Sequence, residues 1–224
     1  MPIHPKAVLF DMDGVLFDSM KNHTASWYRT MTSLNIPCTR DEFYLYEGCT
    51  GKDTINSFFR RSYRRDASDK EILDIYETKS SLFKELPEPL PMAGAREVVE
   101  DVVESGLKIV LVTGSGQKSL LERLGSAFPG IFSRENMVTA FDVKEGKPSP
   151  EPYLKGLVKA GVARNEAIVV ENAPMGVRAG HAAGIFTVAV NTGPIPDQAL
   201  MDEGADILFR DMSDFHMNIK EIIS

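Results

Sequence analysis

Residues 7–14 read AVLFDMDG, and they decide the fold because a continuous apolar run leads directly into two aspartates. The run from Ala7 to Phe10 is typical of a strand that is buried on both faces, as the strands of parallel sheets are. Comparable runs recur at Ile109–Val112, Ile168–Val170 and Thr187–Val190, with a weaker one at Ile207–Phe209. We therefore expect a parallel sheet that is covered by helices.

Helical patterns separate these apolar runs. Val98, Val99, Val102 and Val103 recur at helical spacing, and Gly106 follows them as the expected C-cap. A second pattern places small residues along one face, which are Gly176, Ala179, Gly180 and Ala183. This helix can therefore lie close against the sheet. The alternation of strands and helices predicts a doubly wound α/β fold.

Residues 18–90 interrupt the alternation. They contain no apolar run typical of a buried strand, and their helical patterns are rich in charge. The stretch closes with Pro87, Pro89 and Pro91, which favour a stiff, extended connector. We expect a helical domain of residues 18–90 inserted into a core of residues 1–17 and 91–224, with the sheet resuming near Met92.

The composition limits the possible partners. The chain has 224 residues, of which 43% are hydrophobic, and this is enough for a substantial core. Its net charge of −7 argues against binding to nucleic acid or an anionic membrane by bulk charge. Cys38 and Cys49 are too few for a disulfide scaffold or a four-ligand zinc site. Because no signal-peptide pattern or membrane-length apolar run occurs, we expect a soluble, cytoplasmic protein.

Polar side chains follow the predicted strands at the edge of the sheet where ligands of open α/β folds bind. They are Asp11 and Asp13 after the first strand, Thr113, Gly114 and Ser115 after the next, and Glu171 and Asn172 after the third. The loop of residues 146–150 adds Lys147. We expect these residues to form one site.

The residue types in this set favour Mg²⁺ and a phosphoryl group. Carboxylate and carbonyl oxygens are ligands of Mg²⁺, which is usually shared with substrate phosphate. A hydroxyl and backbone N–H groups at a helix N-terminus, together with a lysine, suit phosphoryl oxygens. Each element alone has an ordinary explanation: a turn at DMDG, an N-cap at TGSG, a solvated Lys147, or a Glu171 paired with a neighbouring base. Their occurrence in order, with three of them at strand ends, favours a functional site.

The chain resembles the haloacid dehalogenase superfamily through four motifs, which are Asp11-x-Asp13-Gly14, Thr113, Lys147-Pro148 and Glu171-Asn172. The helical insertion resembles the C1 cap of that superfamily. Residues 10–27, with His23 and Trp27, and the surroundings of Lys147 resemble its β-phosphoglucomutase-like branch. The resemblance implies a Rossmann-like core, obligate Mg²⁺ and phosphoryl transfer through an aspartyl-phosphate.

The resemblance also implies a role for each motif residue. Asp11 would be the nucleophile that attacks phosphorus and also a Mg²⁺ ligand. Asp13 would protonate the leaving oxygen and then activate water, while its backbone carbonyl contacts the metal. Thr113, Gly114, Ser115 and Lys147 would bind the phosphoryl group. Glu171 and Asn172 would complete the metal site.

Several positions depart from the family pattern. The β-phosphoglucomutase-like branch usually has an acid in place of Asn172, so this metal site has one negative charge fewer. The dehalogenase branch lacks the aspartate found here as Asp13, which argues against dehalogenation. In the cap loop of residues 46–53, the mutase branch has a lysine in place of Glu47 and an arginine in place of Gly51. That arginine grips the second phosphate of a sugar bisphosphate, so its absence argues against mutase chemistry.

The cap residues suggest a small substrate. Glu47 fits an anion that it reaches through Mg²⁺ or water, where it would supply the charge that Asn172 lacks; alternatively, it is a solvated loop acid. Tyr76 and Lys79 share a helix face. If Lys79 points into the cleft, Tyr76 fills space beside it; otherwise Tyr76 is a core residue. A small, Mg²⁺-bridged, highly charged substrate suggests pyrophosphate, and the chain is similar to the inorganic pyrophosphatases of the superfamily.

We therefore expect a monomeric, Mg²⁺-dependent phosphohydrolase that converts diphosphate and water into two phosphates. A β-phosphoglucomutase-like phosphotransferase, a small sugar-phosphate phosphatase and a catalytically silent binding module are the alternatives. The intact set of Asp11, Asp13, Thr113 and Lys147 disfavours the last of these. We also expect hinges near Phe17–Met20 and Pro87–Pro91, because the cap must open to admit substrate.

Overall fold

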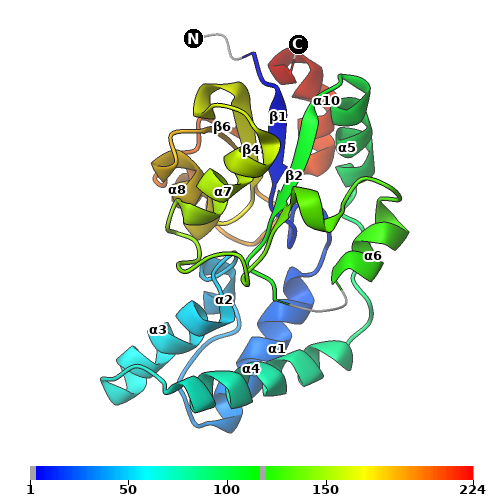
Figure 1. Ribbon diagram of the computed structural model, residues 1–224. Coiled ribbons are helices and arrows are strands. Elements are labelled where there is room, and N and C mark those ends of the chain that lie inside the picture. Colours follow the sequence, from blue (N-terminus) through cyan, green and yellow to red (C-terminus); the bar gives the residue numbers. More distant parts are fainter. Residues whose placement is uncertain (1–3, 117–119, 224) are drawn as a thin grey trace.

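The computed structural model of the protein describes residues 4–116 and 120–223. Its centre is a six-stranded parallel sheet in the order β3-β2-β1-β4-β5-β6 (Figure 1). The strands are β1 (Ala7–Phe10), β2 (Lys108–Val112), β3 (Met137–Val138), β4 (Ala167–Glu171), β5 (Phe186–Val190) and β6 (Ile207–Phe209). The predicted α/β fold and its strands are confirmed. The sequence pattern misses β3, because two residues are too few to form an apolar run.

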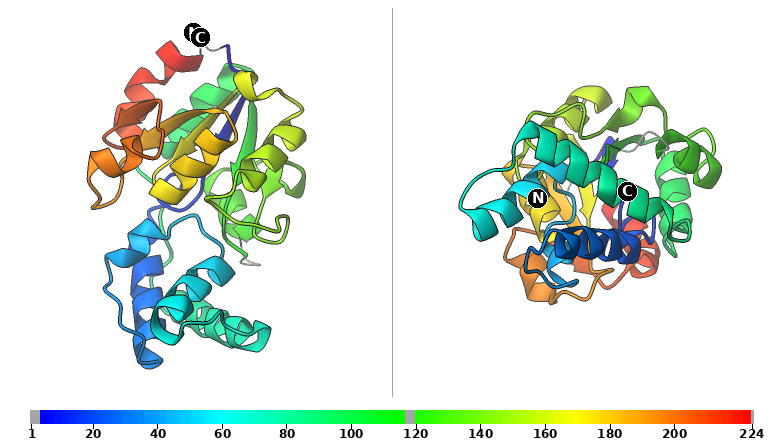
Figure 2. Two further views of the ribbon diagram at one scale, coloured as in Figure 1. Left: turned by 90° about the vertical axis from the view of Figure 1, so that its left-hand side faces the viewer. Right: turned by 90° about the horizontal axis from the view of Figure 1, so that it is seen from below.

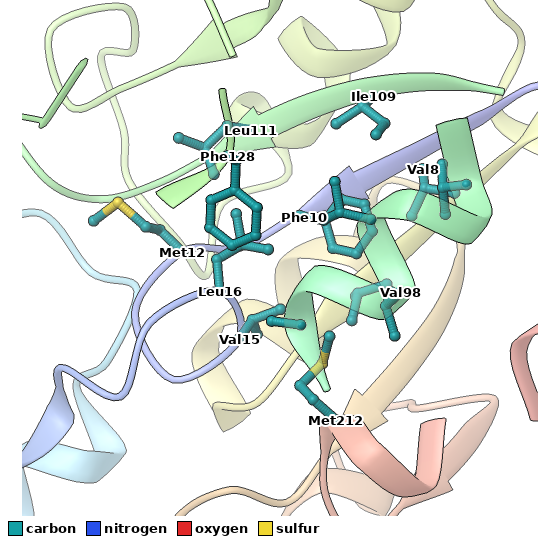
Figure 3. Close-up of a cluster of buried hydrophobic side chains, with 14 of the residues drawn as sticks. Val8, Phe10, Met12, Val15, Leu16, Val98, Ile109, Leu111, Phe128 and Met212 are labelled. Atoms are coloured by element: carbon teal, nitrogen blue, oxygen red, sulfur yellow. The ribbon is translucent and has the colours of Figure 1, made fainter. Parts of the chain in front are cut away.

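Helices cover both faces of the sheet. They are α5 (Ala95–Glu104), α6 (Leu120–Ala127), α7 (Glu151–Ala160), α8 (Pro174–Ala182), α9 (Asp197–Met201) and α10 (Met212–Ile223), with short 3₁₀ turns at Arg134–Asn136 and Arg164–Glu166. Val8 and Phe10 of β1 pack with α5, α6 and α10, as Figure 3 shows around Phe10, Val98 and Met212. Ala7 and Leu9 point to the opposite face and pack with α7 and α8. The strand is apolar at every position because both of its faces are buried.

The sequence predictions for two of these helices are confirmed. α5 ends just before Gly106, which has a φ of +73° that favours glycine. α8 lies so close to the sheet that a Cβ atom on Gly180 would lie 2.6 Å from Oγ1 of Thr187 and 3.2 Å from Cγ1 of Val169. The small residues of α8 therefore set its distance from the sheet.

The close approach of α8 predicts opposite effects of two alanine substitutions on stability. Gly180→Ala should lower the free energy of unfolding by about 1–3 kcal/mol, because the new methyl group overpacks a rigid core. Gly125→Ala in α6 is the matched control, because a Cβ atom there meets nothing within 4 Å. It should raise the stability by up to about 1 kcal/mol, through helix propensity alone. Urea unfolding followed by circular dichroism checks both values, and a Gly180→Ala protein as stable as the parent would contradict the close packing.

Helices α1 (Met20–Ser33), α2 (Glu42–Leu45), α3 (Gly51–Tyr63) and α4 (Asp69–Lys84) form a separate layer, which we call the insertion. It lies below the sheet in Figure 1 and in the left view of Figure 2. Its own apolar core includes Trp27, Met31, Phe43, Phe58 and Ile75. No helix in the described part of the chain is long and apolar enough to cross a membrane.

Two chain segments join the insertion to the core, and they lie side by side. Phe17 forms an antiparallel bridge with Pro91, and the amide of Asp18 donates to the carbonyl of Leu90 at 2.9 Å. After Met92 the chain enters α5, so the sheet resumes at Lys108 and not near Met92 as expected. Met92 nevertheless packs against the core, so the insertion ends before it.

Candidate active site

The predicted site residues surround one cavity between the sheet and the insertion. The core contributes Asp11 and Asp13 after β1, and Thr113, Gly114 and Ser115 after β2, whereas the insertion contributes His23, Glu47, Tyr76 and Lys79. Lys147, Glu171 and Asn172 join this lining through hydrogen bonds. The cavity volume is about 50 Å³, so the space next to Asp11 suits a small ligand.

Lys147 is a buried cation and not a solvated loop residue, because its side chain is 1% exposed. Its Nζ donates to Oδ1 of Asp11 at 2.5 Å, to Oε1 of Glu171 at 2.6 Å and to the carbonyl of Val112 at 3.0 Å. Burial alone would lower the pKa of Lys147, but the two carboxylates raise it above its usual value. Burial raises the pKa of Asp11 to about 8, and the charge of Lys147 opposes this rise. The ionised form of Asp11 therefore depends on positive charge close to it.

A chain of hydrogen bonds fixes the side chain of Asp13. Its Oδ1 accepts from Oγ of Ser19 at 2.5 Å and lies 3.2 Å from Nε2 of His23. The other ring nitrogen of His23, Nδ1, lies 2.7 Å from Nζ of Lys79. Because an ammonium group can only donate, Nδ1 accepts from Lys79 and Nε2 donates to Asp13. Through these hydrogen bonds, two residues of the insertion, His23 and Lys79, position the carboxylate of Asp13 in the core.

The same groups shift one another's pKa. Burial alone would raise the pKa of Asp13, but His23, Ser19 and the charge of Arg123 hold it below its usual value. Burial lowers the pKa of Lys79 to about 8, and the charge of Arg123 acts in the same direction. Burial and the charge of Lys79 also lower the pKa of His23. The structure therefore favours an ionised Asp13 beside a neutral imidazole.

Two oxygen atoms without hydrogen-bond partners and a buried carboxyl group, all with the chemistry of Mg²⁺ ligands, gather at this edge of the sheet. Oδ2 of Asp11 and Oδ1 of Asn172 are buried and have no hydrogen-bond partner among the described residues. Nδ2 of Asn172 donates to Oε1 of Glu47 at 2.9 Å, which orients the amide and brings the Glu47 carboxyl to its side. Burial raises the pKa of Glu47 well above its usual value, so an ionised Glu47 needs a cation. These unsatisfied oxygens fit a divalent cation.

Another predicted ligand, Glu171, differs from these groups. Both of its carboxylate oxygens already accept hydrogen bonds: Oε1 from Lys147 and from Tyr153 at 2.7 Å, and Oε2 from the amide of Asn172 at 3.1 Å. Over residues 4–116 and 120–223, no three His, Cys, Asp or Glu side chains are grouped closely enough to hold a metal by themselves. A Mg²⁺ ion here would therefore need oxygen ligands besides side-chain carboxylates, and the amide oxygen of Asn172 has the chemistry of such a ligand.

Tyr76 closes the cavity on the side of the insertion. A Cβ atom on Gly51 would lie 2.3 Å from Cδ2 of Tyr76, so the ring occupies the space that a larger residue 51 would need. Burial raises the pKa of Tyr76, and the backbone of Gly116 in the core opposes this rise. On the core side, the amide of Ser115 donates to Oγ1 of Thr113 at 3.0 Å. The helix start expected at this turn falls on residues 117–119, outside the described residues.

Sequence reasoning misses three residues that contact or influence the predicted site. Ser19 bonds to Asp13, Tyr153 bonds to Glu171, and the charge of Arg123 acts on Asp13. Tyr153 and Arg123 lie on helices of the core, where they fit an ordinary amphipathic pattern. No local motif distinguishes them, because packing between distant segments brings them to the site.

Comparisons with known proteins identify the family of the chain. Residues 8–190 match the family of haloacid dehalogenase-like hydrolases. The chain is 31% identical to a "Phosphorylated carbohydrates phosphatase" of Thermotoga maritima, over 92% of this chain and 94% of that protein. It is 27% identical to a "Putative pyrophosphatase PpaX" of Caldanaerobacter subterraneus, over 92% of this chain and 90% of that protein.

Solved structures extend the similarity to three dimensions. A "Putative beta-phosphoglucomutase" from Bacteroides vulgatus is 53% identical, with a TM-score of 0.95 over 99% of this chain and 90% of that chain. The match covers the sheet and the insertion together. The fold, the motif residues at the strand ends and these similarities lead to one conclusion: the chain belongs to the haloacid dehalogenase-like hydrolase family and is a phosphohydrolase of that family.

Proposed function

We propose that the protein is a Mg²⁺-dependent inorganic pyrophosphatase that acts through an aspartyl-phosphate on Asp11. The observation that supports this substrate is the position of Glu47, which is 6% exposed and bonded to Asn172 beside the catalytic aspartates. A carboxylate in this position disfavours an anion that arrives alone. It favours an anion that arrives with Mg²⁺, as pyrophosphate does.

The first half of the reaction assigns separate roles to the two oxygens of Asp11. Oδ1, which Lys147 holds at 2.5 Å, would attack phosphorus. The new bond joins Oδ1 to phosphorus, and the bond from phosphorus to the bridging oxygen breaks, so that the second phosphate leaves. Thr113 and Lys147 would hold the transferred phosphoryl group, with Gly114 and Ser115 beside it. Phosphate leaves more readily than a sugar alkoxide, so little protonation by Asp13 is needed.

The second half of the reaction depends on Asp13. Water attacks phosphorus, Asp13 takes its proton, and the bond from phosphorus to Oδ1 of Asp11 breaks, which releases phosphate and restores the carboxylate. The hydrogen bonds from Ser19 and His23 orient Asp13 for this step. Oδ2 of Asp11, the carbonyl of Asp13, Asn172, Glu171 and Glu47 would hold Mg²⁺, which supplies positive charge to the phosphoryl oxygens.

We further propose that residues 18–90 act as a cap over a core of residues 1–17 and 91–224. The two side-by-side segments at Phe17–Met20 and Pro87–Pro91 would serve as the hinges. Polar groups from both sides meet at Asp13 and Asn172, so the site is complete only when the insertion lies against the core. Cap closure would therefore exclude water before phosphoryl transfer.

Relatives that act on phosphorylated carbohydrates make a small sugar-phosphate phosphatase the second candidate. Mutase chemistry is less favoured, because Tyr76 occupies the space beside Gly51 where that branch has an arginine. Phosphate release from pyrophosphate and from a set of sugar phosphates, measured with excess Mg²⁺, tests the proposal. The highest kcat/KM should belong to pyrophosphate. A sugar phosphate with a higher value would replace it as the substrate.

Closure of the cap predicts that Gly114→Ala lowers kcat/KM by about 10–100-fold, because small displacements of reacting groups are costly. A Cβ atom on Gly114 would lie 2.4 Å from the carbonyl oxygen of Gly48 and 2.7 Å from that of Cys49, both in the insertion. Gly116→Ala is the control in the same turn, because its Cβ atom would meet the ring of Phe141, which is 72% exposed and can move away. Equal activities of the two variants would contradict the role of this contact in closure.

A further inference from the structure

Arg123 is a buried cation that the proposed reaction does not use. It lies on α6 of the core, and the residue is 8% exposed. A buried charge is costly unless its surroundings compensate for it, and aromatic rings are part of the surroundings of Arg123.

The guanidinium group of Arg123 contacts aromatic rings from both sides of the hinge. Its Cζ lies 5.6 Å from the ring centroid of Phe17 and 5.9 Å from that of Phe83. Phe17 belongs to the first connecting segment and bridges to Pro91 of the second. Phe83 belongs to α4, the last helix of the insertion. One core side chain therefore contacts the connection and the moving part at once.

Phe83 in turn packs against the residues that orient Asp13. Its ring centroid lies 4.5 Å from that of His23 and 5.0 Å from Nζ of Lys79. His23 is the residue whose Nε2 lies 3.2 Å from Asp13. A displacement of Phe83 would therefore move His23 and Lys79, and with them the hydrogen bonds that fix Asp13.

We propose that Arg123 is a positioning residue, which holds Phe83 against the Phe17 hinge and thereby keeps His23 in place on Asp13 when the insertion is closed. The inference rests on the proposed function, in which Asp13 activates water. It differs from the catalytic assignments because the contacts that carry it are those of Arg123 with Phe17 and Phe83, which lie outside the cavity lining. The effect of its charge on the pKa of Lys79 supports the close approach of these groups.

The test uses rapid-quench kinetics with radiolabelled pyrophosphate, which separates phosphorylation of Asp11 from hydrolysis of the aspartyl-phosphate. Arg123→Met should slow hydrolysis at least about 10-fold and slow phosphorylation less, so that phosphoenzyme accumulates. Arg123→Lys should recover part of the rate, because it keeps a cation near the rings. Arg178→Met is the matched control on α8, where the guanidinium pairs with Glu203 at the surface, and it should behave as the parent enzyme.

A double variant tests the link through Phe83. In the Phe83→Leu background, Arg123→Met should have little further effect, so the two fold-losses should not multiply. If Arg123→Met does not fold, Phe83→Leu alone must still show phosphoenzyme accumulation. Unchanged hydrolysis in folded Arg123→Met, equal slowing of both steps, or fold-losses that multiply would each overturn the inference. Failure of the proposed function itself would be recognised separately, as full activity of Asp13→Asn or as a lack of phosphate release from pyrophosphate by the parent enzyme.

Discussion

Asp11→Asn is expected to abolish phosphate release from every substrate, with a loss of about 10⁴-fold or more in kcat. The amide of asparagine is a poor nucleophile, so no aspartyl-phosphate can form. The substitution also removes the negative charge that would attract a cation beside Oδ2 of Asp11. Phosphate release with excess Mg²⁺, together with acid-quench trapping of the phosphoenzyme, measures both effects.

The variant should still fold, because Lys147 keeps its hydrogen bonds to Glu171 and to the carbonyl of Val112. Circular dichroism should confirm this. Asp18→Asn is the matched control in the same segment, because the side chain of Asp18 is 46% exposed and pairs with Lys21 at the surface. Its activity should equal that of the parent enzyme. Substantial turnover by folded Asp11→Asn would refute the assignment of the nucleophile.

Glu47→Ala and Glu47→Asn are expected to lose about 100-fold or more in kcat/KM for pyrophosphate, while hydrolysis of small monoesters falls by less than about 10-fold or improves. If Glu47 recognises the metal that accompanies pyrophosphate, its removal weakens that recognition most. It also removes the repulsion that a metal-poor monoester would meet. Steady-state assays over a range of Mg²⁺ concentrations measure this change in preference.

Glu42→Gln is the control for these two variants. Glu42 lies on α2 of the insertion, outside the cavity, where it pairs with Arg61. It should leave the preference between substrates unchanged. If both Glu47 variants keep the parent kcat/KM for pyrophosphate throughout the Mg²⁺ titration, Glu47 has no part in substrate recognition, and the substrate is better sought among sugar phosphates.

Most of the core fold is predictable from the sequence, because buried segments have a recognisable pattern of apolar residues. The strands of this sheet have both faces covered, so they appear as unbroken apolar runs, as in Ala7–Phe10. β3 escapes this rule, because it pairs only through Met137 and Val138 with the end of β2. The boundary near Met92 is also harder to predict, because a residue that packs on the core need not belong to a strand.

Site residues that directly follow a strand are predictable from the sequence. Site residues that reach the site through packing between distant segments are not. Asp11, Thr113 and Asn172 stand next to predicted strands, so topology brings them together. The burial of Lys147 and its two carboxylate partners cannot be read from its loop. Tyr153 and Arg123 are hidden more completely, because their neighbours come from other helices and connections. The sequence contains these residues without showing what they touch.

The order of strands in the sheet has a consequence for how the protein is made. β1 is completed first, yet Ala7 pairs with Lys108 on one side and with Ala167 on the other. On the ribosome, β1 must therefore wait without partners while the insertion, which has its own apolar core, emerges and can form helices. The central strand closes the longest loops of the sheet, and such non-local pairing is slow. The insertion would thus take shape before the sheet whose strand ends carry Asp11, Thr113 and Glu171.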